Sequence, residues 1–151
     1  MSDLKFSVSG RSESASRIAV KARDFTMIVD EPPALGGENR GPNPVEYELT
    51  ALLGCLNVMG HLIASEMAFT INSLQINASG ELNPDRLFGK ATTDRAGYKA
   101  INVEVIVDAD ADQATLDSWL AQVENRCPVS DNLANRTPVT LNLETVETVA
   151  G

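Results

Sequence analysis

The feature that most constrains the fold of this chain is one long helical pattern near its middle, over residues 44–67. Pro44 suits the first turn of a helix, where its missing N–H costs no hydrogen bond, and Asn43 can cap that end. The pattern contains the longest apolar run of the sequence, TALLGCLNVMGHLIA at residues 50–64. A helix with so broad an apolar stripe has to pack against other elements, so its surroundings decide the fold class.

Strand patterns lie on both sides of this helix. Alternating apolar and polar side chains predict three strands before it and two after it, separated by segments rich in turn-forming residues. The strands are expected within residues 4–8, 17–30 (two strands), 73–82 and 98–109, and the connecting turn and loop at residues 9–16 and 31–44. In the last of these strands Ile101, Val103, Val105 and Val107 alternate cleanly, so one face is expected to be buried.

The C-terminal part predicts two more helices and a closing strand. Residues 110–126 form an amphipathic pattern capped by Asp110 or Asp112, with Leu116, Trp119, Leu120 and Val123 at helical spacing. A short third helix is predicted within residues 126–136, and a strand at residues 137–146. The order βββ-α-ββ-α-α-β predicts a single α+β domain over residues 1–151, with mostly antiparallel sheet packed on one long helix.

Charge and hydropathy exclude several classes of partner. The chain has 21 acidic and 12 basic residues and a formal charge of −9, whereas nucleic acids and anionic membranes bind basic surfaces. The apolar run is shorter than the roughly 20 residues that span a bilayer, and Asn57 and His61 interrupt it. Because the first ten residues lack the apolar core of a signal peptide, a cytoplasmic protein is expected. Two cysteines in a reducing compartment are expected to be metal-binding, catalytic or inert.

The first cysteine, Cys55, lies within the apolar run. On a helical wheel its apolar neighbours fall within about 80° of it, which places Cys55 at the centre of the expected buried stripe. A thiol there either packs as a small hydrophobic group or acts as a nucleophile in an apolar pocket. Gly54 and Gly60 each cost the helix roughly 1 kcal/mol relative to alanine, which predicts close approach of another helix, a partner subunit or a ligand.

The second cysteine, Cys127, precedes Pro128 and is therefore predicted at the N-cap of the short third helix. The free N–H groups and the dipole at that end favour a thiolate, so position alone ranks Cys127 as the more acidic thiol. The alternative is a cysteine that only caps the helix and packs beneath the sheet. Two cysteines and the single histidine, His61, make a poor ligand set for zinc, so no metal site is predicted.

Two segments resemble the OsmC/Ohr family of thiol-dependent peroxidases, which reduce organic hydroperoxides. They are DEPPALGGENRGPNPVEYELTALLGC at residues 30–55 and RCPVSDNLA at residues 126–134, and the resemblance covers nearly the whole chain. It implies an OsmC-like fold and an intertwined homodimer with active sites at the subunit interface. It also implies an organic hydroperoxide as substrate and a dithiol as reductant, and we expect no metal or bound organic cofactor.

The resemblance assigns roles to particular residues. Cys55 becomes the peroxidatic cysteine, which attacks the peroxide, and Cys127 becomes the resolving cysteine. This reverses the ranking by helix position, because Cys55 lies mid-helix, where the dipole gives no help, and needs a positive charge to ionise. The family supplies an arginine from the first hairpin, and the match here is Arg11, with Arg17 as the alternative.

One position departs from the family's peroxidases, which carry a carboxylate directly after the NP to hold that arginine over the thiol. Here Val45 follows the NP, and Glu46 is one residue further on, where it is the candidate replacement. An apolar wall of Leu52, Met59 and Leu62 is expected to favour hydroperoxides with a hydrocarbon tail.

The predicted function is therefore a peroxidase that forms a sulfenic acid on Cys55 and resolves it with Cys127. The alternative is a binding module that holds a small apolar ligand at the dimer interface, with incidental cysteines. A purely structural dimer is a third possibility. Reaction of the thiols with hydroperoxides distinguishes the peroxidase from the other two alternatives.

Overall fold

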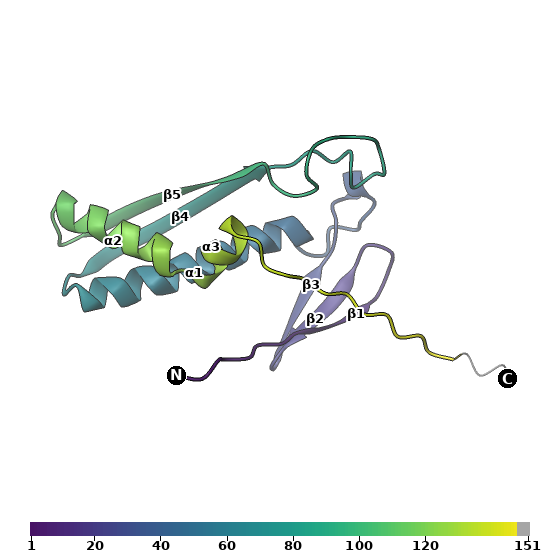
Figure 1. Ribbon diagram of the computed structural model, residues 1–151, viewed down its shortest axis with the longest axis horizontal. Coiled ribbons are helices and arrows are strands. Elements are labelled where there is room, and N and C mark those ends of the chain that lie inside the picture. Colours follow the sequence, from purple (N-terminus) through teal and green to yellow (C-terminus); the bar gives the residue numbers. More distant parts are fainter. Residues whose placement is uncertain (148–151) are drawn as a thin grey trace.

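The computed structural model describes residues 1–147 and has the α+β architecture that the sequence predicts (Figure 1). The strands are β1 (Ser9–Ser12), β2 (Ile18–Ala22), β3 (Phe25–Val29), β4 (Ile71–Glu81) and β5 (Ala100–Ala109). The helices are α1 (Pro44–Glu66), α2 (Gln113–Arg126) and α3 (Pro128–Ala134), with a short 3₁₀ turn at Pro33–Leu35.

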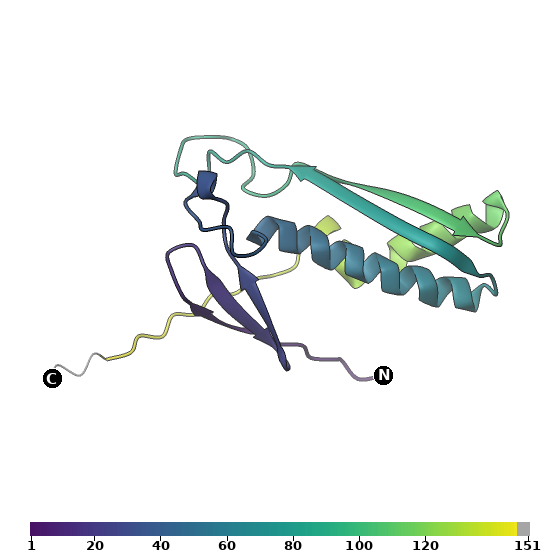
Figure 2. The same ribbon diagram turned by 180° about the vertical axis from the view of Figure 1, so that it is seen from behind.

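The central element is α1, and the other elements are arranged around it in two groups. The strands β4 and β5 form a long antiparallel ribbon along one side of α1, and α2 and α3 also pack against this helix (Figures 1 and 2). The second sheet, with the antiparallel order β1-β2-β3, stands apart from the ribbon near the start of α1. The central helix therefore connects a hairpin unit to a layer of ribbon and helices.

Both ends of α1 lie where the sequence predicts them. The Asn43 side chain accepts a hydrogen bond from the Glu46 N–H at 2.9 Å, and the Glu46 carboxylate accepts one from the Asn43 N–H at 2.9 Å. This reciprocal pair is a capping box, and Pro44 occupies the first turn. The helix ends at Glu66, with Met67 as its C-cap. Asp112 rather than Asp110 caps α2, through a 2.8 Å bond from the Thr115 N–H.

The core lies between α1, α2 and the ribbon. Its buried side chains come from α1 and α2 and from the residue that joins α2 to α3: Leu52, Leu56, Ile63, Ala64, Trp119, Val123 and Cys127. Trp119 packs directly against α1 at Gly60, which has no side chain and whose carbonyl accepts the indole N–H at 2.8 Å. A Cβ built on Gly60 would lie 3.2 Å from the Trp119 ring, so the predicted close approach at this glycine is to α2.

Two predicted strands at the ends of the chain are not strands in the structure. Residues 4–8 and 137–146 form no sheet with any other part of residues 1–147, and their apolar side chains are largely exposed. The first strand is instead β1, at Ser9–Ser12, which was predicted to be a turn. The alternating pattern predicts an extended backbone but not its partner, and a strand also needs another backbone beside it.

Only part of the apolar surface of α1 is covered. Its buried residues are Leu52, Leu56, Gly60, Ile63 and Ala64, whereas Val58 and Leu62 are 62% and 46% exposed. Cys55 lies between these two faces and is only partly buried. The expectation that Cys55 is at the centre of the buried stripe is therefore wrong, because periodicity locates the apolar residues without showing which of them a neighbour covers.

The full length of α1 also changes the comparison with a bilayer. The helix has 23 residues and is long and apolar enough to cross a membrane by length and composition alone, although the run at residues 50–64 is shorter. In the fold, α1 packs against β4, α2 and α3. A core helix passes the same test of length and composition, and 28% of the apolar window of α1 is buried within one chain.

Candidate active site

The fold brings the two cysteines together from distant parts of the sequence. Cys55 lies midway along α1, and Cys127 is the single residue between α2 and α3. Because α1 packs against both of these helices, their junction lies against α1. The Cys127 side chain is a direct neighbour of the Cys55 thiol, and both thiols are free.

Two contacts hold α2 on α1 and so help to place this junction. The buried indole N–H of Trp119, in the middle of α2, donates to the Gly60 carbonyl in the C-terminal third of α1 at 2.8 Å. Arg126, the last residue of α2, makes a bidentate pair with Glu66 at the end of α1, with one N···O distance of 2.9 Å. Cys127 follows directly after this anchored arginine.

Cys127 occupies the N-cap position that the sequence predicts. Its Sγ accepts a hydrogen bond from the Ser130 N–H at 3.3 Å, and its carbonyl accepts the Asp131 N–H at 2.9 Å. The side chain is 1% exposed and belongs to the buried core. Cys127 is therefore a cap for α3 and a core residue at the same time, and solvent does not reach its sulfur within one chain.

Cys55 has a different environment. Burial raises the pKa of its thiol above the ordinary value, and the neighbouring Cys127 side chain raises it further. The Val129 N–H, in the first turn of α3, donates to Cys55 and lowers its pKa in part. A backbone donor from α3 was not expected from the sequence, and it partly supplies what the middle of α1 lacks. Within one chain the net direction is still upward.

Neither hairpin arginine acts on Cys55 within one chain. Arg11 is exposed on β1 and lines a shallow surface hollow with other residues of β1 and β2. Arg17 forms ion pairs with Glu13 and Glu38 at 2.9 and 2.8 Å, and these partners raise its pKa. Among the described residues, the groups that shift the pKa of Cys55 include no arginine.

Glu46 is also placed away from the thiols. Its carboxylate is the partner of the Asn43 N–H in the capping box, which accounts for the glutamate at this position by helix capping alone. The Val45 carbonyl accepts a hydrogen bond from the Tyr98 hydroxyl at 2.8 Å, which ties the start of α1 to the segment before β5. Burial and then the charges of Glu48 and Glu46 raise the pKa of Tyr98.

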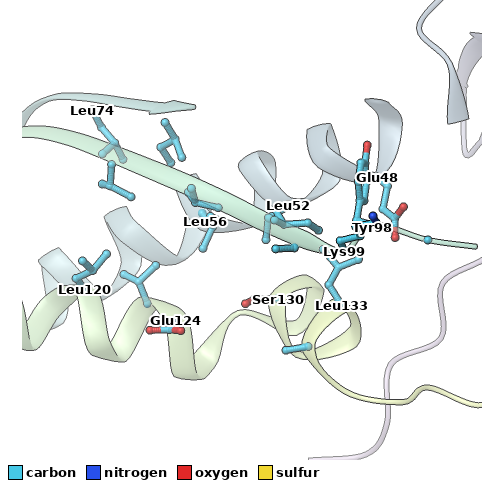
Figure 3. Close-up of a pocket in the computed structure, with 18 of the residues that line it drawn as sticks. Glu48, Leu52, Leu56, Leu74, Tyr98, Lys99, Leu120, Glu124, Ser130 and Leu133 are labelled. Carbon is cyan, nitrogen blue, oxygen red and sulfur yellow. The ribbon is translucent and has the colours of Figure 1, made fainter. Parts of the chain in front are cut away.

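An open cavity of about 650 Å³ lies between α1, the ribbon and the other two helices. Its walls are mainly apolar, and Figure 3 shows Glu48, Tyr98 and Lys99 gathered at one end of it. Leu52 lines this cavity, but Met59 and Leu62 do not. Met59 is partly buried against the core and Leu62 is 46% exposed, although all three residues of the expected apolar wall lie within two turns of Cys55 on α1.

A family model described as OsmC-like protein matches residues 37–142 of this chain. This match covers well over half of the sequence and includes both cysteines. The chain belongs to the OsmC-like family. No curated protein sequence matches it significantly.

Solved structures of OsmC-like proteins share its fold. An OsmC-like protein from Mycoplasma pneumoniae superposes with a TM-score of 0.77 at 20% identity, covering 89% of this chain and 91% of that one. An organic hydroperoxide resistance protein from Elizabethkingia anophelis gives a TM-score of 0.65 at 14% identity, over 89% and 91% of the two chains. The organic hydroperoxide resistance protein OsmC from Legionella pneumophila gives a TM-score of 0.63 at 14% identity, covering 88% of this chain and 91% of that one. At these identities the likeness shows the fold.

One further residue organises the hairpin side of this OsmC-like chain and was missed in the sequence. Asp30 is fully buried, and its carboxylate accepts bonds from the Ser16 hydroxyl at 2.8 Å, the Glu31 N–H at 2.8 Å and the Arg40 N–H at 3.1 Å. Burial alone would raise the pKa of Asp30, but these hydrogen bonds outweigh it and lower that pKa. The sequence signal that could have identified Asp30 is its position directly after an apolar strand, at the start of the DEPP segment.

No group of three or more histidine, cysteine or acidic side chains in residues 1–147 is arranged to hold a metal ion. The groups that the described part of the chain places at the candidate site are its two thiols and the backbone N–H groups at the start of α3.

Proposed function

We propose that this OsmC-like chain is a thiol-dependent peroxidase that reduces organic hydroperoxides through Cys55 and resolves the product with Cys127. The observation that carries the proposal is the pairing of the two thiols at the junction of α1, α2 and α3. A redox couple needs its sulfurs close enough to bond without large backbone movement. Family membership and the hydroperoxide resistance proteins among its structural neighbours support a redox role at the level of the family.

The proposed reaction has two steps. The Cys55 thiolate attacks the terminal peroxide oxygen, the O–O bond breaks, and the alkoxide leaves and takes up a proton to become an alcohol. Cys55 is then a sulfenic acid. The Cys127 sulfur attacks the Cys55 sulfur, the S–O bond breaks, and water leaves as the disulfide forms. A dithiol reductant closes the cycle.

The order of the thiols follows from access. Cys127 is 1% exposed, whereas Cys55 is only partly buried and lies at the border of the uncovered apolar face of α1. A hydroperoxide with a hydrocarbon tail can contact Val58 and Leu62 on that face while its peroxide group meets Cys55. The apolar face therefore favours alkyl and aryl hydroperoxides over hydrogen peroxide.

We also propose that the working unit is a homodimer. Three exposed apolar sets support this proposal: Val58 and Leu62 on α1, Leu4, Phe6 and Val8 before β1, and Val139, Leu141 and Leu143 after α3. The two terminal sets alternate as strands do, yet they have no strand partner within residues 1–147. A second copy would supply both the missing sheet edges and the opposite wall of a substrate site over the exposed face of α1.

A second copy is also the proposed source of the cation. The pKa of Cys55 is raised within one chain, so a peroxidase of this design needs a positive charge from elsewhere. Arg11 is the candidate because it is exposed and makes no ion pair among the described residues. Arg17 remains the alternative, with Glu13 and Glu38 in place of the carboxylate that Val45 replaces.

The decisive experiment is stopped-flow oxidation with cumene hydroperoxide. Wild type is expected to react far faster than a free thiol in solution and to end as an intramolecular Cys55–Cys127 disulfide, two hydrogens lighter by mass spectrometry. Cys127→Ser is expected to turn over once and stop at a sulfenic acid. Cys55→Ser is expected not to react, and Arg11→Ala is expected to slow the first step.

The controls separate the parts of this proposal. Arg23→Ala is the matched control for Arg11→Ala, since Arg23 is exposed on the same sheet, at the β2–β3 turn, and is expected to have no effect on the rate. Size-exclusion chromatography with light scattering measures the oligomeric state. A wild type no faster than free thiol would overturn the peroxidase, and a monomer at micromolar concentration would overturn the dimer.

Binding of a small apolar ligand is a second candidate function, and the cavity of about 650 Å³ favours it. This volume lies within the usual range for small-molecule sites, and its walls are mainly apolar. Trp119, the only tryptophan of the chain, lines the cavity and can report binding by its fluorescence. Saturable quenching by an unreactive alkanol, unchanged in Cys55→Ser, would support this function. A linear, non-saturable response would exclude it.

A further inference from the structure

The two sulfurs of the candidate couple differ in how far another molecule can reach them. Cys127 is 1% exposed and belongs to the buried core, whereas Cys55 is only partly buried. Assembly with a second chain can only reduce these exposures further. A reductant that approaches the oxidised pair therefore has one sulfur to attack, and that sulfur belongs to Cys55.

The two sulfurs also differ in how well they could leave. In thiol–disulfide exchange the rate rises as the leaving thiolate becomes more stable, and it depends on which sulfur is attacked. The Cys127 Sγ accepts the Ser130 N–H at 3.3 Å, in the first turn of α3. A hydrogen bond of this kind strengthens when its acceptor becomes an anion. Access and leaving-group stability thus point to the same direction of attack.

We infer that the Cys55–Cys127 disulfide is reduced by attack on the Cys55 sulfur, with Cys127 as a leaving thiolate that the Ser130 N–H receives. The inference rests on the proposed function for the oxidation that forms this disulfide in the cell. The thiol–disulfide exchange itself does not depend on a peroxidase activity. Ser130 acts through its backbone as a positioning residue. The hydrogen bond from the Ser130 N–H to the Cys127 sulfur would then both cap α3 and stabilise the leaving thiolate.

The exchange balances in two steps. A reductant thiolate bonds to the Cys55 sulfur, the Cys55–Cys127 bond breaks, and its electron pair remains on Cys127 as a thiolate that the Ser130 N–H stabilises. In the second step the other thiol of a dithiol attacks the reductant's own sulfur in the mixed disulfide. That step releases the Cys55 thiolate and leaves the reductant as a cyclic disulfide. A monothiol stops after the first step, which makes the attacked sulfur identifiable.

The test uses the full chain and avoids peroxide. The protein is oxidised to its intramolecular disulfide with stoichiometric diamide, mixed briefly with 2-mercaptoethanol, quenched with acid and alkylated with N-ethylmaleimide. Peptide mass spectrometry then locates the two labels. The mercaptoethanol adduct is expected on Cys55 and the maleimide on Cys127, in about tenfold excess over the reverse pattern. An adduct equally or mainly on Cys127, or no intramolecular disulfide, would overturn the inference.

A pair of variants at position 130 tests the receiving hydrogen bond. Ser130→Pro removes the N–H at the third position of α3 and is expected to slow the exchange about tenfold. Ser130→Ala removes only the hydroxyl, keeps the N–H, and is expected to exchange at the wild-type rate. Equal exchange rates in Ser130→Pro and Ser130→Ala would show that this hydrogen bond does not stabilise the leaving thiolate.

The outcomes stay distinct from those of the peroxidase test. If Ser130→Pro does not fold, as judged by far-UV circular dichroism, the adduct position in wild type and Ser130→Ala still decides which sulfur is attacked. An adduct on Cys127 with rapid peroxide turnover would overturn this inference alone. An adduct on Cys55 without rapid peroxide turnover would overturn the peroxidase alone.

Discussion

The contact between Gly60 and Trp119 gives a quantitative test of how α2 is held on α1. Trp119 is 2% exposed, and its indole N–H donates to the Gly60 carbonyl at 2.8 Å. Trp119→Phe removes this hydrogen bond, worth about 1 kcal/mol, and leaves a void where the larger ring was. The carbonyl keeps its partner within the helix, so no buried acceptor is left unpaired. The expected loss in free energy of unfolding is about 2–3 kcal/mol.

The second arm of the test is Gly60→Ala. Alanine is favoured over glycine in a helix by about 1 kcal/mol. In wild type the new methyl group would lie 3.2 Å from Trp119 Cζ2 and 3.5 Å from Leu74 Cδ2, so crowding should offset that gain. In the Trp119→Phe background the crowding ring atom is gone, and the full gain should appear. The expected coupling energy between the two positions is about 1 kcal/mol.

The assay is urea denaturation followed by far-UV circular dichroism, because Trp119 is the only tryptophan and its fluorescence is lost in half of the variants. Ser65→Ala, exposed on the same helix, is the matched control and should have the same small effect in both backgrounds. If Gly60→Ala stabilises both backgrounds by the same amount, the two residues do not touch as described. Slower disulfide formation in Trp119→Phe would show that this contact also places Cys127.

Three further predictions concern single groups. Asp30→Asn should lower Tm, because its amide brings a donor into a site where the carboxylate accepts three bonds. The pKa of Asp30 is lowered in the folded state, so its contribution to stability is present above the ordinary aspartate range and is lost as the pH falls through the folded pKa. The Tm difference between Asp30→Asn and wild type should therefore shrink toward acid pH, and a difference that grows would contradict this. Cys127→Ala should cost about 1–2 kcal/mol in urea denaturation by removing the cap acceptor, whereas Cys127→Ser keeps an acceptor and should cost less. Alkylation of Cys55 by iodoacetamide in the isolated chain should continue to accelerate above the ordinary thiol range, because its pKa is raised; a plateau near neutral pH would contradict this.

The sequence predicts the long helix best, because all of the information for that element is local. Asn43, Pro44 and Glu46 form a capping box through contacts between near neighbours, and a 23-residue helix follows. The same holds for Cys127 at the start of α3, where the following proline marks the first turn. Residues 137–146 show the limit of this approach, since whether they form a strand depends on a partner that the pattern cannot name.

The candidate site is less predictable for the same physical reason. The proximity of Cys55 to Cys127 depends on how α1 and α2 cross, which spacing along the chain does not fix. The resemblance to OsmC-like proteins supplied that pairing as an expectation. Neither source predicted the Val129 N–H on Cys55, because a backbone donor carries no side-chain signature. Glu46 has two explanations, since its capping role by itself accounts for a carboxylate that the resemblance made a catalytic candidate, and the catalytic role stays a prediction.

Acidity and access give opposite rankings of the two thiols, and their magnitudes decide between them. Below its pKa, each unit by which a thiol pKa rises lowers the thiolate fraction about tenfold, but nucleophilicity recovers by roughly a factor of three. The net loss for a raised pKa at Cys55 is therefore about threefold per unit. For Cys127, at 1% exposure, attack on a hydroperoxide requires local opening of α3 or α2, and each 1.4 kcal/mol of opening lowers the rate about tenfold. A modest opening free energy outweighs that loss, so under the proposed mechanism Cys55 is expected to react first even though Cys127 has the better-capped position.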